Sequence, residues 1–271
     1  MRKSSTLCVA VNEDGVATVS LDRAEVRNAL NPTLIGELTK TIEELSSDAG
    51  VRIIVLRGEG PVFCAGADLN WLRDVSGQSK EEVSIDSQRL QRLFTVLNQS
   101  PKLTIARIHG AAMAGGVGLV ACCDVAIAES GARFSISEVR LGLVPGLISA
   151  FLLGKIGPGH LRYLSRSGAV IGAEHAYNIG LVHVVAKSME ELDRRVKEHV
   201  EMGLQASPDA IATCQGLLAD IGADPSVGLA DKALAWNVSC RTSPEALEGI
   251  GAFLARRPPP WAAIAARQKS P

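Results

Sequence analysis

The sequence predicts an α/β (α+β) fold in which strand-rich units with helices between them are followed by a helical C-terminal region. Apolar runs of strand length alternate with helical patterns up to about residue 147, and beyond that point the chain is mostly helical in pattern. No GxGxxG fingerprint follows a predicted strand, which argues against a dinucleotide-binding Rossmann domain. We place the core at residues 1–195 and the helical region at residues 196–271.

The individual elements follow from local patterns. Residues 7–21 are typical of two short strands around an Asp14–Gly15 turn. A helix is predicted from Pro32 with Asn31 as its N-cap, and residues 51–58 have the apolar pattern of a strand that is covered on both faces. The other expected elements are helices at 81–100, 115–124, 158–168, 173–180 and 188–205, and strands at 103–110, 124–130, 133–139 and 181–185.

Composition excludes several classes of partner. The chain has 271 residues, a net charge of -1 and only 4% aromatic residues, so we expect neither a nucleic acid nor an anionic membrane surface as a partner. No apolar run approaches the roughly 20 residues of a membrane helix, and the N-terminus lacks the pattern of a signal peptide. The six cysteines form no CxxC pair and have no histidine cluster nearby, so we expect no metal site and a cytoplasmic location.

Two bends concentrate small residues, CAGAD at 64–68 and AAMAGGVG at 111–118. Each follows a predicted strand and precedes a helical pattern. Two backbone N–H groups from such bends, aimed at one point, would form an oxyanion hole. Tight packing between strand and helix explains the same residues, and both interpretations are open at this point.

Glu138 follows the second bend among apolar neighbours. Burial would raise the pKa of its carboxyl group, which suits acid–base catalysis. The alternative is a strand-end glutamate that faces solvent or pairs with Arg140.

Four segments together resemble the crotonase, or enoyl-CoA hydratase/isomerase, superfamily: RNAL at 27–30, FCAGADL at 63–69, HGAAMAGGVGLVACCD at 109–124 and FSISEVRLGLVPG at 134–146. The resemblance implies a spiral of repeated ββα units with a C-terminal helical region. It implies an acyl-CoA thioester as substrate, no cofactor apart from the coenzyme A of that substrate, and a homotrimer or homohexamer.

The resemblance also implies roles for single residues. The N–H groups of Ala67 and Gly115 would hold the thioester oxygen, and Glu138 would be the acid–base group. Arg27 could also meet a phosphate of coenzyme A, or it could be an ordinary solvated charge. The segments that would contact coenzyme A contain Val26, Arg27, Ala29, Ala65, Asp68 and Leu69.

The sequence departs from the family pattern in three places, one of which is VPGLISAF at 144–151, where many members have a glycine-rich PGxGGT. The resemblance would place the first glutamate of two-glutamate hydratases at position 118, so we expect Gly118 to face the substrate, and Ala114 replaces a glycine of the usual run. Either Glu138 does both proton transfers, or a substrate carboxylate orients the water, or the reaction is an isomerisation.

One branch of the superfamily is especially similar, the bacterial hydratases of 3-methylglutaconyl-CoA and isohexenylglutaconyl-CoA in leucine or acyclic terpene catabolism. Their substrates carry a second carboxylate, for which Arg140 or Arg73 would be the cation. We therefore expect a hydratase (a hydro-lyase). An enoyl-CoA isomerase and a non-catalytic acyl-CoA-binding protein are the alternatives.

Overall fold

The computed structural model describes residues 2–74, 77–223 and 228–262. A seven-stranded sheet forms the centre, in the order β1-β2-β3-β4-β5-β7-β10. The first three strands pair antiparallel, and the pairs from β3 to β10 are all parallel. The strands are β1 (Arg2–Lys3), β2 (Leu7–Val11), β3 (Val16–Leu21), β4 (Ile53–Gly58), β5 (Leu103–Ile108), β7 (Val125–Glu129) and β10 (Val184–Ala186).

A second, smaller sheet contains β6 (Ala111–Met113), β8 (Arg133–Ser135) and β9 (Val170–Gly172). Two isolated parallel bridges extend this sheet: Cys64 pairs with Ala112, and Leu30 pairs with Ala67. Within β5-β6-α4 and β7-β8-α5, the first strand joins the large sheet and the second joins the small one. The expected repeated ββα units are present, and the small sheet collects their second strands.

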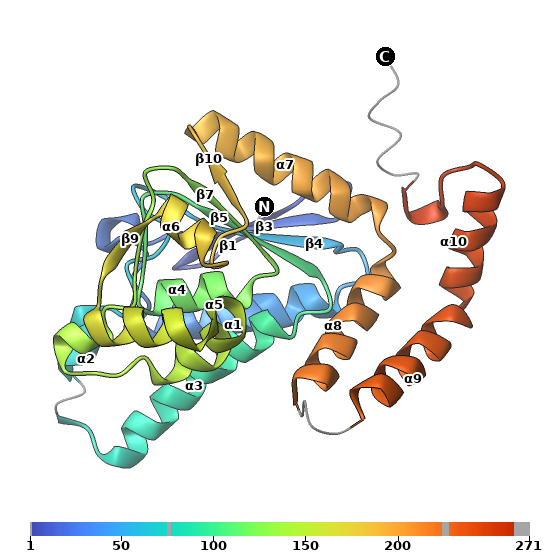
Figure 1. Cartoon of the computed structure of the whole chain (residues 1–271). Helices are drawn as coiled ribbons and strands as arrows, with labels where there is room; N and C mark the ends of the chain where they lie inside the picture. Colours follow the sequence, from blue (N-terminus) through green and yellow to red (C-terminus); the bar gives the residue numbers. More distant parts are fainter. Residues whose placement is uncertain (1, 75–76, 224–227, 263–271) are drawn as a thin grey trace.

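Helices cover both faces of the large sheet (Figure 1). Ile54 and Leu56 of β4 pack with the helices on one face, whereas Ile53 and Val55 pack with α7 on the other. This alternation explains why the strand is apolar throughout. The helices are α1 (Pro32–Ser47), α2 (Leu69–Asp74), α3 (Lys80–Asn98), α4 (Gly115–Cys122), α5 (Gly146–Ser167), α6 (Ala173–Asn178), α7 (Met189–Gln205), α8 (Pro208–Ala223), α9 (Leu229–Arg241) and α10 (Pro244–Leu254), with short 3₁₀ turns η1 (Ala24–Val26), η3 (Glu138–Leu141) and η4 (Pro260–Ala262).

Several local predictions are confirmed. β2 and β3 form the expected hairpin, and the Asn31 side chain caps α1 by accepting a hydrogen bond from the Leu34 N–H at 2.9 Å. The strand predicted at 133–139 is wrong beyond Ser135, because the chain turns into η3 at Glu138. The helix predicted from residue 158 begins at Gly146 and continues across a kink at Gly157.

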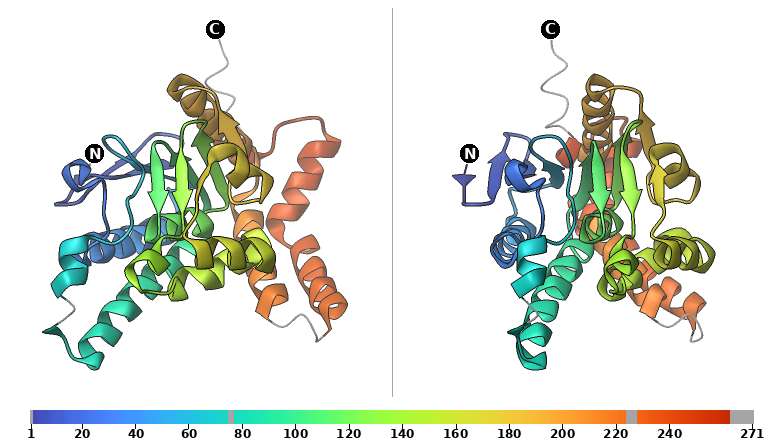
Figure 2. Two further views of the ribbon diagram at one scale, coloured as in Figure 1. Left: turned by 60° about the vertical axis from the view of Figure 1, so that its left-hand side comes forward. Right: turned by 90° about the vertical axis from the view of Figure 1, so that its left-hand side faces the viewer.

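The helical region that extends from the body begins after α7. The expected boundary at residues 195 and 196 falls inside α7, whose Leu192, Val196 and Leu204 pack on the large sheet. Beyond α7, α8 leads into α9 and α10, which extend beside the body (Figure 2). The last nine residues of the predicted region, 263–271, lie outside the described residues. Among the described helices, none is long and apolar enough to cross a membrane.

Candidate active site

Three parallel segments form the frame of the site. Cys64 bridges Ala112 of β6, and β6 pairs with β8. Both pairings are parallel, so the three segments run in one direction and end at the same edge of the small sheet. Ala67 and Gly115 each lie three residues beyond the bridged pair (64 to 67 and 112 to 115), and Glu138 follows the end of β8. The topology therefore brings these three candidates to one edge.

The Ala67 amide is left free by the pairing around it. The Leu30 N–H donates to the Gly66 carbonyl at 2.7 Å, and the Asp68 N–H donates to the Leu30 carbonyl at 2.8 Å. Ala67 lies between these two bonds, where the extended chain points its N–H to the other side. Within the described chain, this N–H donates to no acceptor.

The Gly115 amide is free for a different reason. Gly115 is the first residue of α4, and the first N–H groups of a helix have no acceptor within the helix. It donates to no other described residue either. The preceding residue is fixed, because the Ala114 N–H donates to the Ser135 carbonyl of β8 at 2.8 Å. A free amide at a helix N-terminus favours a partial negative charge on its acceptor.

The small residues of the first bend allow the two amides to approach each other. A Cβ atom on Gly66 would lie 2.8 Å from the Met113 carbonyl oxygen, so a larger residue would separate the segments. Gly66 also has φ +91, a conformation that favours glycine. Close approach of two backbone segments therefore accounts for the CAGAD sequence.

Glu138 has the environment expected of an acid–base group. Burial raises the pKa of its carboxyl group, against a smaller lowering effect of a backbone hydrogen bond. Its Oε2 atom is buried and has no hydrogen-bond partner in the described chain. Neither alternative for this residue fits, since the carboxylate does not pair with Arg140 and is not solvated on both oxygens.

Arg140 does not share a face with Glu138. The prediction assumed a strand, in which residues two apart point the same way, but η3 has about three residues per turn. The Arg140 side chain instead lies over Gly168, where a Cβ atom would be 3.0 Å from its Nε atom. The guanidinium group has no salt bridge within the described ranges. Arg73, the other candidate cation, lies in the last turn of α2.

The segments expected to contact coenzyme A lie side by side. The Ala65 N–H donates to the Arg27 carbonyl at 3.0 Å, which joins the RNAL segment to the first bend. Arg27 is exposed, and Leu69 exposes 68% of its surface at the start of α2. Val26 and Ala65 are half-buried, and Ala29 is buried.

Asp68 has a structural role in the bend. Its carboxylate accepts hydrogen bonds from the Arg23 guanidinium and from the Asn70 N–H, both at 3.0 Å. Its own N–H and carbonyl bond to Leu30 and Leu72. These contacts engage both carboxylate oxygens and the backbone of Asp68, so the residue holds the bend in place.

Gly118 was expected to line the substrate site, and the structure leaves no free space for a side chain there. Gly118 is buried within α4. A Cβ atom there would overlap Cγ2 of Ile148 and lie 2.9 Å from two ring carbons of Phe94. The space that the missing glutamate would need is filled by side chains of α3 and α5, so Gly118 is a packing residue.

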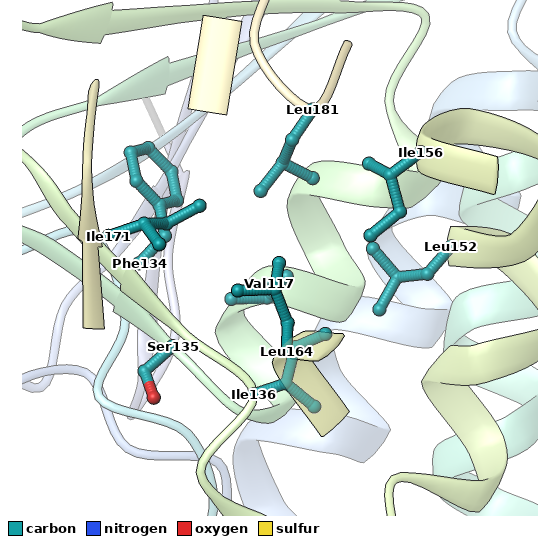
Figure 3. Close-up of a pocket in the computed structure, with 9 residues that line it drawn as sticks. All are labelled: Val117, Phe134, Ser135, Ile136, Leu152, Ile156, Leu164, Ile171 and Leu181. Carbon is teal, nitrogen blue, oxygen red and sulfur yellow. The ribbon is translucent and has the colours of Figure 1, made fainter. Parts of the chain in front are cut away.

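A pocket lies between α4, α5 and the small sheet (Figure 3). Its only polar lining residue is Ser135, whose hydroxyl donates to the Gly168 carbonyl at 3.1 Å. The pocket offers a ligand no free polar group, so we assign it to interior packing. The other lining residues are Val117, Phe134, Ile136, Leu152, Ile156, Leu164, Ile171 and Leu181.

Two supporting residues were missed by the sequence interpretation. Asn28 is fully buried with φ 56, and its side chain donates to the carbonyls of Glu59 and Val62 at 2.8 and 2.9 Å. Arg23 donates to the Ala29 carbonyl as well as to Asp68. The asparagine was the available signal, because Asn tolerates positive φ better than most residues.

Known proteins share both the sequence pattern and the fold. The family model for enoyl-CoA hydratase/isomerase matches residues 11–263. The crystal structure of an enoyl-CoA hydratase from Shewanella pealeana superposes with a TM-score of 0.90 at 32% identity, covering 94% of this chain and 96% of that one. Crotonyl-CoA hydratase of Syntrophomonas wolfei is 31% identical, covering 90% of this chain and 94% of that protein.

Human mitochondrial methylglutaconyl-CoA hydratase is more distant, at 30% identity over 90% of this chain and 73% of that protein. The match to the family model spans nearly the whole sequence, and the structural neighbours share the ββα architecture described above. The chain therefore belongs to the enoyl-CoA hydratase/isomerase family of enzymes, the crotonase superfamily.

Proposed function

We propose that the protein hydrates the double bond of a 2-enoyl-CoA thioester. The observation that carries this proposal is the edge of the small sheet, where two unpaired backbone amides and one buried carboxyl group follow three parallel segments. The amides of Ala67 and Gly115 would donate to the thioester oxygen. Such donors contribute about 3–4 kcal/mol each to an oxyanion transition state.

A single carboxyl group can complete the reaction. The Glu138 carboxylate takes a proton from water while the water oxygen bonds to Cβ and the double-bond electrons move onto the thioester oxygen. The resulting enolate then collapses, and its Cα takes the same proton back from Glu138. The sum is the addition of one water molecule, with Glu138 regenerated. Burial raises the pKa of Glu138 toward neutral pH, and a carboxyl group with such a pKa can both take up and release a proton during the reaction. No cofactor is needed beyond the coenzyme A of the substrate.

For the acyl group we propose a 3-substituted glutaconyl-CoA, 3-methylglutaconyl-CoA or isohexenylglutaconyl-CoA. Two observations support it. Position 118 has no room for a second carboxylate, so a carboxylate on the substrate would have a role in orienting the water. Arg140 is exposed and forms no salt bridge in the described chain, so its charge is available to a carboxylate that reaches beyond the face of Glu138. The similarity to human methylglutaconyl-CoA hydratase is in keeping with this choice.

The presence of only one carboxyl group also favours a second candidate, enoyl-CoA isomerisation. Moving a double bond between Cβ and Cγ requires one group that removes and returns a proton, and Glu138 could do both. A non-catalytic acyl-CoA-binding protein would have no need of a buried, unpartnered carboxyl group at this place.

We further propose a homotrimer or homohexamer in the cytoplasm. The apolar surface of the last helices supports self-association, because such a surface on a water-soluble monomer is unusual. Its largest exposed side chains are Leu234, Val238, Leu247, Ile250, Phe253 and Leu254. Sedimentation velocity of the full chain would measure the assembly size, and a monomer would contradict the proposal.

A substrate panel tests the reaction. Crotonyl-CoA, 3-methylglutaconyl-CoA and a 3-enoyl-CoA are offered separately while the absorbance of the conjugated thioester is followed. A fall with the first two reports hydration, and a rise with the third reports isomerisation. No change with any of them would contradict both. Arg140→Gln should raise KM for 3-methylglutaconyl-CoA at least tenfold and leave that for crotonyl-CoA unchanged. Equal effects on both esters would argue against the dicarboxylic substrate.

A further inference from the structure

The residues immediately before the two candidate amides both have positive φ. Gly66, before Ala67, has φ +91, and Ala114, before Gly115, has φ 46 and ψ −116. Because the peptide unit is planar, the backbone angles of the preceding residue decide where the next N–H points. Gly66 and Ala114 therefore aim the two donors.

Ala114 adopts a conformation that normally belongs to glycine. Its angles match the first central position of a type II′ turn, where a Cβ atom is unfavourable. They also differ from those of Arg27, which has φ 56 and ψ 38 in the ordinary left-handed region. Hydrogen bonds hold the strained residue on both sides: the Ala114 N–H donates to Ser135, and the Ala114 carbonyl accepts from Val117 and Gly118 at 2.8 and 3.2 Å. Strain of this kind persists only where the surroundings determine it.

The strained methyl group lies against the other aiming residue. A Cβ atom built on Gly66 would be 3.1 Å from the Cβ atom of Ala114. The methyl group of Ala114 thus fills the space beside Gly66 and limits the movement of the peptide that carries the Ala67 N–H. Glycine at position 114 would relieve the strain but leave this space empty.

We propose that Ala114 is a positioning residue whose methyl group fixes the two donor peptides relative to each other, so that both N–H groups meet one oxygen. This inference rests on the function proposed above, in which that oxygen belongs to the thioester. An alanine retained only for packing would behave differently when removed. Its loss would lower stability and leave the reaction unchanged, whereas loss of a strained positioning residue should raise stability and slow the reaction.

Ala114→Gly tests the proposal, with Ala111→Gly as the matched control. Ala111 belongs to the same segment but lies in β6 without positive φ, so its replacement removes a methyl group without relieving strain. We expect Ala114→Gly to lower kcat on the order of tenfold, less than the 10²–10³ of a lost donor, with KM nearly unchanged. Its Tm should stay level or rise by about 2–4 °C. Ala111→Gly should lower Tm and keep kcat.

A spectroscopic measurement separates positioning from turnover. Acetoacetyl-CoA forms an enolate that absorbs more strongly than its keto form, and an oxyanion hole would increase the bound enolate fraction. We expect this absorbance to fall in Ala114→Gly and to be retained in Ala114→Ser, which keeps the Cβ atom. Unchanged kcat and absorbance in Ala114→Gly, or equal losses in the glycine and serine variants, would overturn the proposal. Absence of hydration and isomerisation in the unsubstituted enzyme would instead overturn the proposed function.

Discussion

Ile148 of α5 occupies the space that a side chain on Gly118 of α4 would need. A Cβ atom on Gly118 would overlap the Ile148 Cγ2 atom and would lie 2.9 Å from the Phe94 ring. Phe94 is fully buried and Ile148 exposes 2% of its surface, so neither can move aside into solvent. The contact of α3, α4 and α5 therefore excludes a glutamate at this position. That contact leaves no space for a second protein carboxylate at position 118.

Restoring the glutamate should fail. Gly118→Glu would force a charged side chain into a packed interior, and overpacking alone costs about 1–3 kcal/mol. We expect Tm to fall by at least 5 °C, with no gain of crotonyl-CoA hydration. Gly36→Glu is the matched control, because Gly36 is an exposed helical glycine with no atom near its Cβ position. That variant should keep its Tm. A Gly118→Glu protein of normal Tm with faster hydration would show that the helices can separate.

Glu138→Gln should abolish turnover while the ester still binds. The amide cannot take a proton from water, so kcat should fall at least 10³-fold, whereas the two backbone donors are unchanged. Steady-state kinetics and binding of a substrate ester by calorimetry measure the two effects separately. Residual kcat within tenfold of the unsubstituted enzyme would remove Glu138 from the acid–base role.

The same substitution should stabilise the fold at neutral pH. Burial raises the folded-state pKa of Glu138 above its ordinary value of 4.5, so the ionised form is disfavoured by folding. Stability is lost as pH rises from the unfolded pKa through the raised folded pKa, and glutamine removes this loss. We expect a higher Tm for Glu138→Gln at pH 7.5 and no difference at pH 4. Equal Tm values at both pH values would mean that the carboxyl group is solvated.

Local signals in the sequence predicted the frame of this site well. The N-cap at Asn31 and the two small-residue bends depend on neighbours within a few residues. Short-range geometry fixes such features, so a single sequence was enough to locate the two bends and to single out Glu138, whereas the roles of Ala67 and Gly115 came from the family resemblance. The turn from β8 into η3 was missed because alternation of apolar residues continues beyond Ser135.

Roles that depend on distant residues could not be predicted. Gly118 meets Phe94 and Ile148, and Asp68 meets Arg23, which is 45 positions away. The hydrophobic periodicity of a sequence carries no information about contacts between such distant positions. In the sequence, a glycine packed in the interior looks the same as a glycine that faces a substrate. The two differ only in the residues that the fold places against them.

Asp68 should show its structural role as a stability effect that depends on pH. Burial acts to raise its pKa, but the hydrogen bonds and charge of Arg23, with the Asn70 N–H, outweigh burial and lower it. A lowered pKa means that the carboxylate stabilises the fold above the ordinary aspartate value of 3.8, and that this contribution is lost as pH falls through the folded-state pKa. Asp68→Asn should therefore destabilise the protein by about 3 kcal/mol at pH 7, since Arg23 loses its buried partner.

Urea denaturation at pH 7 and pH 3 measures this effect, and Asp22→Asn is the matched control. Asp22 pairs with Lys3, whose side chain is 66% exposed, and a surface pair contributes about 0–1 kcal/mol. The difference between Asp68→Asn and the unsubstituted protein should shrink at pH 3, which lies below the ordinary aspartate pKa of 3.8, because the unfolded chain binds the proton there more readily than the folded protein. A difference of the same size at both pH values would show that the shape of the aspartate, and not its charge, holds the bend that presents the Ala67 amide.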